Sequence, residues 1–158
     1  MQEQKYEKST FAAGCFWGVE AAFRQINGVK STRVGYTDGK MESPSYEDVC
    51  TDETGHAEAV EVTFDPKKVS YEDLLKVFWQ NHNPTQLNRQ GPDVGTQYRT
   101  AIFYHNEAQK KAAEKSKEKL FKRLKSSIAT EIVPAQEFYP AENYHQKYLQ
   151  KRGAKVCH

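Results

Sequence analysis

Alternating apolar and polar residues predict a series of short strands. In residues 56–66, "HAEAVEVTFDP", Val60, Val62 and Phe64 would lie on one side of an extended chain. Glu58 would share that apolar side, an unusual place for a carboxylate. Further strands are predicted at four other places in the chain: residues 9–14, 29–36, 98–105 and 127–134.

Helical spacing appears between these strands. In residues 16–26 apolar side chains recur three or four positions apart, and Gly28 is placed to end a helix there. Ser70 and Asp73 form the pattern of a capping box, which predicts a helix over residues 71–81.

Two more helices and one long loop are expected. Asn106 is suited to cap a long charged helix over residues 107–127, and Pro140 is suited to the first turn of a short helix over 140–149. Residues 37–55 are polar and contain glycine and proline, so we predict a loop long enough to carry function.

Loose alternation of strands and helices favours an α+β fold, a two-layer α/β sandwich on a mixed β-sheet. We expect a ferredoxin-like core, long loops and a flexible C-terminal tail. Because no repeat or low-complexity segment divides the chain, residues 1–158 are expected to form a single domain.

Composition narrows the possible functions. The chain has 158 residues, 37% of them hydrophobic, which is enough for a core that needs no disulfides. Its 23 Lys+Arg and 21 Asp+Glu give a net charge of +2, too balanced to make nucleic acid the expected partner. The sequence shows neither a signal peptide nor an apolar run long enough to cross a bilayer, so we expect a cytoplasmic protein that does not bind membranes.

Three cysteines, Cys15, Cys50 and Cys157, suggest thiol chemistry. They match neither a paired disulfide framework nor zinc-ligand spacing, and the histidines add no metal-binding pattern. Cys15 lies where the first predicted strand meets the first predicted helix, and the free N–H groups and dipole of a helix start favour a thiolate. The alternative is a small buried hydrophobic residue, as most free cysteines are.

The other candidate residues also have structural alternatives. Burial on the apolar side would raise the pKa of the Glu58 carboxyl and preserve a transferable proton, but the side chain could also reach water or pair with a lysine. Cys157 lies in a polar tail, as a mobile resolving thiol or as an accidental one. Cys50, beside Val49, is expected to be a buried bystander, and Trp79 a core residue.

Six blocks of sequence together resemble one known family. They are "GCFWG" (14–18), "GYTDG" (35–39), "PSYEDVC" (44–50), "TGHAEAV" (54–60), "NPTQLNRQGPDVGTQYR" (83–99) and "AENYHQKYL" (141–149). Several blocks in the right order are more specific than any one of them, and they span nearly the whole chain. The sequence is therefore similar to the peptide methionine sulfoxide reductase A family.

This resemblance implies roles for individual residues. The cysteine of "GCFWG", Cys15, would be the nucleophile, and its neighbours Phe16 and Trp17 would shape the pocket for the substrate's S-methyl group. The glutamate of "GHAE", Glu58, would be the acid. Cys157 is the candidate resolving cysteine. Some members of the family relay the disulfide to a second C-terminal cysteine, and this sequence has only Cys157 there.

The resemblance also implies how the substrate is held. Tyr46 of "PSYE" and Tyr98 of "QYR" would donate hydrogen bonds to the sulfoxide oxygen. Asp93 of "GPDVG" and His145 of "YHQ" would hold the backbone of the substrate.

The reaction implied is thiol-dependent reduction of free and protein-bound methionine (S)-sulfoxide, a repair of oxidatively damaged proteins. Cys15 would become a sulfenic acid, Cys157 would condense with it to a disulfide, and thioredoxin would reduce that disulfide. The resemblance implies no metal or organic cofactor, and we expect a monomer. The residues alone leave three alternatives: a thiol peroxidase, a non-catalytic module that grips methionine-like side chains, and a cysteine hydrolase.

Overall fold

The computed structural model describes residues 6–14, 16–40, 44–51 and 54–142 of the chain. In chain order, the elements within these ranges are β1 (Glu7–Ala13), α1 (Phe16–Arg24), β2 (Val29–Thr37), α2 (Tyr46–Cys50), β3 (Ala57–Phe64), α3 (Tyr71–Gln80), β4 (Arg89–Gln90), β5 (Asp93–Val94), the 3-10 helix η1 (Thr96–Tyr98), β6 (Thr100–Tyr104), α4 (Glu107–Leu124), β7 (Glu131–Pro134) and β8 (Tyr139–Pro140).

Six of the described strands form one sheet, in the order β7-β6-β1-β3-β2-β8, and β4 pairs separately with β5. Neighbouring strands are antiparallel except β6 and β7, which run parallel, so the sheet is mixed. This confirms the expected α+β fold on a mixed sheet. The finer expectation of a ferredoxin-like core stays a prediction.

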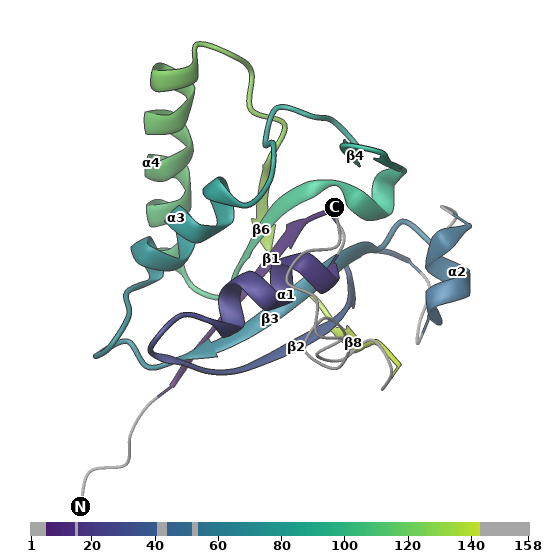
Figure 1. Ribbon diagram of the computed structural model, residues 1–158, viewed down its shortest axis with the longest axis horizontal. Coiled ribbons are helices and arrows are strands. Elements are labelled where there is room, and N and C mark those ends of the chain that lie inside the picture. Colours follow the sequence, from purple (N-terminus) through teal and green to yellow (C-terminus); the bar gives the residue numbers. More distant parts are fainter. Residues whose placement is uncertain (1–5, 15, 41–43, 52–53, 143–158) are drawn as a thin grey trace, which may run out of the picture.

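Helices α1 and α3 lie over one face of the sheet, and α4 lies beside α3 (Figure 1). The ring of Phe11 in β1 joins these layers, because its centroid lies 5.0 Å from that of Phe23 in α1 and 5.3 Å from that of Phe78 in α3. Burying one such ring stabilises the fold by about 1.5–3 kcal/mol. The opposite face carries small side chains such as Ala59, against which Phe138 packs.

Strand β3 has the predicted alternation. Val60, Val62 and Phe64 are fully buried in the cluster that includes the helices. Since side chains two residues apart share a face, Glu58 lies on this same side, and its register partner in β2 is Tyr36. The strand therefore places a carboxyl at the end of an apolar layer.

The predicted helix starts are confirmed for α3 and α4. Ser70 Oγ accepts a hydrogen bond from the Asp73 backbone N–H at 3.0 Å, and the Asp73 carboxylate accepts one from the Ser70 N–H at 3.2 Å. Before α4, the side chain of Asn106 accepts from the Gln109 N–H at 2.9 Å. The five predicted strands correspond to β1, β2, β3, β6 and β7.

The prediction that residues 37–55 form only a loop was wrong, because α2 lies within them. A second capping box starts this short helix: Ser45 Oγ accepts from the Asp48 N–H at 3.1 Å, and Asp48 accepts from the Ser45 N–H at 2.9 Å. Val49 gives the helix one fully buried apolar contact. The polar composition hid both features.

The prediction that Pro140 begins a helix was also wrong. Pro140 lies in β8, opposite Gly35 of β2. Proline has no N–H to donate and is tolerated at the edge of a sheet, and the next residue, Ala141, restores the pairing by donating its N–H to the Val34 carbonyl at 2.9 Å. Residues 143–149 of that predicted helix and the predicted flexible tail lie outside the described residues.

Candidate active site

The Glu58 side chain is 1% exposed. Its Oε1 accepts a hydrogen bond from the backbone N–H of Phe16, the first residue of α1, at 3.3 Å. Its Oε2 accepts one from Nε2 of Gln97 in η1 at 2.8 Å. Burial disfavours the charged carboxylate while the two donors favour it, so the site holds a carboxyl fixed in place and removed from water.

Aromatic rings surround the start of α1. The ring of Phe16 is almost fully buried, with its centroid 5.7 Å from that of Tyr36 and 6.4 Å from that of Tyr46. Trp17 is half-buried, and its ring stacks on Tyr46 with the centroids 6.2 Å apart. The structure thus brings the predicted Phe16, Trp17 and Tyr46 together, with Phe16 packed as part of the core and Trp17 partly open to solvent.

The two predicted phenols lie close to Glu58. Burial raises the pKa of Tyr46, and the charge of Glu58 raises it further. Burial and the charge of Glu58 likewise raise the pKa of Tyr98, against the opposite effect of a hydrogen bond with Tyr46. Both hydroxyls therefore keep their protons at neutral pH and can act as hydrogen-bond donors.

Hydrogen bonds to Glu142 hold the N-terminal end of α2, which carries Tyr46. Both carboxylate oxygens of Glu142 accept from the Tyr46 backbone N–H, each at 3.2 Å. The hydroxyl of Tyr36 donates to the same carboxylate at 3.4 Å. An acidic group at a helix start also complements the partial positive charge there. Glu142 therefore helps to hold the Tyr46 backbone next to the aromatic cluster.

The segment with β5 and η1 completes the site from the other side. Asp93 lies near enough for its charge to contribute to the raised pKa of Tyr98. Gln97 is 3% exposed, and its Nε2 lies 3.6 Å from Cys50 Sγ as well as 2.8 Å from Glu58. The described part of the site therefore gathers Glu58, Tyr98, Asp93 and Gln97.

The exposure of Cys50 contradicts the prediction of a buried bystander. Cys50 is the last residue of α2, where Val49 occupies the inward position. Besides its contact with Gln97, Cys50 hydrogen-bonds the Tyr46 side chain. The sequence analysis did not select Cys50 or Gln97 as site residues. Cys50 stands in the block "PSYEDVC" with Tyr46, and Gln97 stands in "GTQYR" with Tyr98.

Three predicted site residues, Cys15, His145 and Cys157, lie outside the described residues. In the sequence, only Gly14 and Cys15 stand between the last residue of β1, Ala13, and the first residue of α1, Phe16. The predicted strand-to-helix change is therefore confirmed at this point of the chain.

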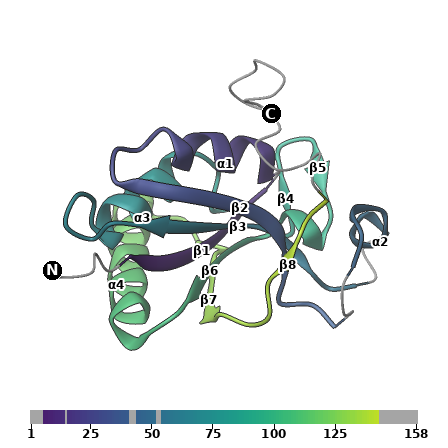
Figure 2. The same cartoon turned by 90° about the horizontal axis from the view of Figure 1, so that it is seen from below.

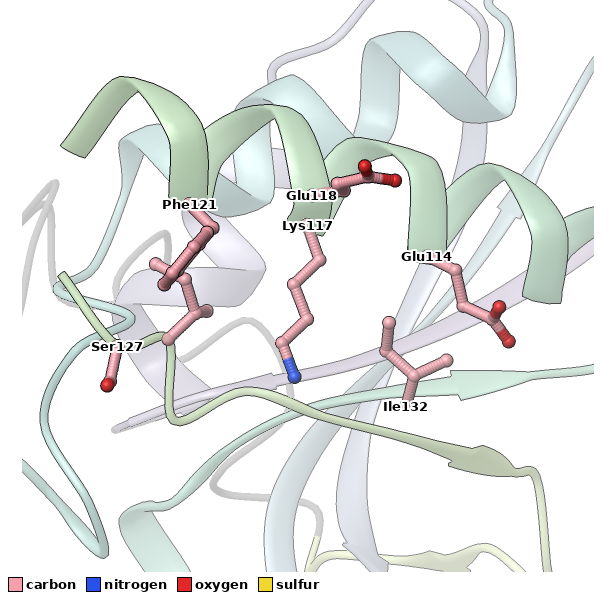
Figure 3. A pocket seen from close by; sticks show the side chains of 7 residues that line it. Glu114, Lys117, Glu118, Phe121, Ser127 and Ile132 are labelled. Atoms are coloured by element: carbon pink, nitrogen blue, oxygen red, sulfur yellow. The ribbon is translucent and has the colours of Figure 1, made fainter. Parts of the chain in front are cut away.

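A hollow of about 600 Å³ lies elsewhere, between α4 and the segment that leads into β7 (Figure 3). Lys117 reaches across it and donates to the Thr130 carbonyl at 2.8 Å, while Phe121 and Ile132 line its apolar parts. None of the described candidate residues lines this hollow, so it is separate from the candidate active site.

The described residues hold neither a cluster of metal-binding side chains nor a helix suited to cross a membrane. They contain no grouping of three or more His, Cys, Asp or Glu side chains arranged to hold a metal ion. Across the same ranges, no helix combines the length and the apolar character needed to span a bilayer.

Comparison with known proteins agrees with the geometry. The family model described as peptide methionine sulfoxide reductase matches residues 7–158. Peptide methionine sulfoxide reductase MsrA of Methanosarcina acetivorans is 65% identical over 149 residues, which cover 93% of this chain and 79% of the relative.

Solved structures show the same likeness. Reduced Mxr1 from Saccharomyces cerevisiae is 40% identical with a TM-score of 0.90, covering 96% of this chain and 88% of that one. Mxr1 in complex with Trx2 is 27% identical with a TM-score of 0.66, covering 93% and 87%. With a family match over most of its length and a relative of this identity, the chain belongs to the peptide methionine sulfoxide reductase A family.

Proposed function

We propose that this chain reduces methionine (S)-sulfoxide, free and in proteins, through a nucleophilic Cys15 and a proton-donating Glu58. As a member of its family, the chain is a peptide-methionine (S)-S-oxide reductase. The observation that carries the residue-level proposal is the buried Glu58 carboxyl beside two protonated phenols. Such a site offers a proton and two donors to one strongly accepting oxygen.

Substrate binding uses the aromatic and polar groups around this carboxyl. The sulfoxide oxygen accepts from the hydroxyls of Tyr46 and Tyr98, and the S-methyl group rests on Trp17, with Phe16 behind it. These donors strengthen their interaction as negative charge grows on the oxygen, which stabilises the transition state more than the bound substrate. Asp93 and, by resemblance, His145 hold the backbone of the substrate.

The reductase step transfers the oxygen to the enzyme. The Cys15 thiolate attacks the sulfoxide, Glu58 supplies one proton to the oxygen, and methionine leaves while Cys15 becomes a sulfenic acid. Cys157 then condenses with the sulfenic acid, releasing water and forming a disulfide. A dithiol must reduce this disulfide by exchange.

Thioredoxin is the proposed reductant. The solved complex of the yeast relative Mxr1 with Trx2 supports this partner for a chain of the same fold. The physiological role that follows is repair of oxidised proteins. We further propose that residues 1–158 act as one cytoplasmic domain and as a monomer.

The direct test is stereospecific turnover. Purified protein is incubated with dithiothreitol and either the S or the R epimer at sulfur of a methionine sulfoxide peptide, and methionine is measured. The expected result is methionine from the S epimer alone, with none formed by Cys15→Ser. Rapid consumption of hydrogen peroxide with no methionine formed would instead support a thiol peroxidase, and binding of the peptide without turnover would support a binding module.

A further inference from the structure

We infer that Gln97 is a positioning residue that orients the Glu58 carboxyl for proton transfer. The inference rests on the proposed function, because it concerns the proton that Glu58 delivers to the sulfoxide. Glu58 accepts two hydrogen bonds that come from separate elements, one from α1 and one from η1.

The two donors restrict where Glu58 can carry a proton. The Phe16 N–H occupies a lone pair of Oε1 at 3.3 Å, and Gln97 Nε2 occupies a lone pair of Oε2 at 2.8 Å. A proton on either of those lone pairs would face another hydrogen instead of an acceptor. The hydrogen bond from Gln97 therefore excludes the acidic proton from the lone pair of Oε2 that it occupies and fixes the orientation of the carboxyl.

Gln97 is itself held in place. Its side chain is buried, and the same Nε2 lies 3.6 Å from Cys50 Sγ. The neighbouring Arg99 anchors η1, donating to the Thr96 carbonyl at 3.0 Å and pairing with Asp38 at 3.1 Å. Because η1 is anchored, the Gln97 side chain loses little conformational entropy when it donates to Glu58, as a positioning residue requires.

These contacts predict how replacing Gln97 should change the pH dependence of the reductase step. The reductase step needs the Cys15 thiolate and a protonated Glu58, so its rate should fall on both the acidic and the alkaline side. A donor such as Gln97 favours the ionised carboxylate, and removing it makes Glu58 a weaker acid. Titratable groups near this carboxyl are Tyr46, Tyr98, Tyr36 of the paired strand β2, and Cys50, which lies 3.6 Å from Gln97 Nε2. The pKa values of Tyr46 and Tyr98 are raised above the ordinary value for tyrosine, so these two groups stay protonated at neutral pH.

The test uses Gln97→Met, which keeps the volume and removes the amide. Its matched control is Gln109→Met, another buried glutamine, whose Nε2 donates to the Lys8 carbonyl at 2.8 Å at the start of α4. Methionine formed in a single turnover is measured from pH 5 to 10 for both variants and the wild type. Thermal unfolding is recorded alongside, so that lost stability is separated from lost chemistry.

We expect Gln97→Met to lower the maximal single-turnover rate by about tenfold to hundredfold, since a misplaced reacting group costs this much. The alkaline limb should move to higher pH, KM should change less than the rate, and Gln109→Met should keep the wild-type profile. Should Gln97→Met fail to fold, Gln97→Glu replaces it; two adjacent carboxyls should move the alkaline limb in the same direction.

Two other outcomes are distinguishable. A folded Gln97→Met or Gln97→Glu protein with the wild-type rate and pH profile overturns the positioning role and leaves the proposed function intact. If the wild type itself forms no methionine, the proposed function fails before Gln97 is tested.

Discussion

Glu58 is the residue on which the proposed chemistry depends most. It is removed from water by the apolar face of β3 and yet receives hydrogen bonds from the first residue of α1 and from η1. A general acid needs a proton that is available and correctly aimed, and burial and fixed donors supply these two conditions separately. In the proposed mechanism, Tyr46 and Tyr98 add neutral donors that stabilise the charge developing on the sulfoxide oxygen.

Glu58→Gln should lower the single-turnover rate by about 10²–10⁴-fold, because the amide keeps the shape of the side chain but has no acidic proton. The measurement is methionine formed per enzyme after rapid mixing with excess substrate. Glu61→Gln is the control, since Glu61 is on the same strand but pairs with Arg33 at 3.1 Å. Equal rates for Glu58→Gln and wild type at neutral pH would refute the acid role.

Trp17→Ala should raise KM by about tenfold with a smaller effect on the maximal rate, because in the proposed complex the lost ring contacts the S-methyl group of the substrate. Trp79→Ala is the control. Trp79 packs against the core and donates from its Nε1 to Ser116 at 2.6 Å, so its loss should lower the melting temperature and leave KM unchanged. An unchanged KM in Trp17→Ala would show that Trp17 is only a packing residue.

At the level of elements, the short helix α2 controls where Tyr46 stands. A helix of five residues has too few internal hydrogen bonds to be stable by itself. The capping box of α2 and the Glu142 carboxylate therefore supply most of its stability. Its outward end presents Cys50, and its inward side presents Val49. The aromatic contact between α1 and α2 then depends on a few polar bonds.

Ser45→Ala should lower the single-turnover rate about two- to fivefold, because loss of the cap costs about 1 kcal/mol and lets α2 open locally. The global melting temperature should hardly change. Ser70→Ala removes the equivalent cap from α3, a helix built into the core, and should lower the melting temperature by about 2–4 °C without affecting the rate. The opposite pattern, a slow Ser70→Ala and a normal Ser45→Ala, would contradict this account of α2.

Local signals were enough to predict several elements, and the reason is that each depends on residues near in sequence. The capping box at Ser70 and the alternation of β3 are of this kind. The hydrogen bonds of Glu58 could not be predicted from the sequence, since its donors lie 42 and 39 residues away in the chain. Helix α2 carried a readable cap at Ser45, but its polar surroundings resembled a loop.

For the whole molecule, the sheet acts as a platform with the candidate site at one end. The start of α1, helix α2 and the β4–β5 ribbon gather there, while α4 lies toward the other end (Figure 2). Strand order could not be derived from the sequence, because it is set by contacts between distant strands such as β2 with β8. The family resemblance supplied Tyr46, Tyr98 and Asp93, which no local pattern singles out.

Cys157→Ser should complete one turnover and then stall when thioredoxin is the reductant, because the Cys15 sulfenic acid has no partner thiol. Steady-state methionine formation measures this. The exposed Cys50 makes the control informative, since Cys50→Ser should continue to turn over. Undiminished turnover of Cys157→Ser would assign resolution to Cys50 or to direct reduction.

The central claim is that Cys15 takes the oxygen from methionine sulfoxide and is resolved within the chain. A thiol count tests it most directly: fully reduced protein is titrated before and after excess methionine (S)-sulfoxide, without reductant, beside Cys15→Ser. We predict the loss of two thiols per chain with methionine formed, and no loss in the variant. Retention of all thiols in the wild type, with no methionine formed, would contradict the account.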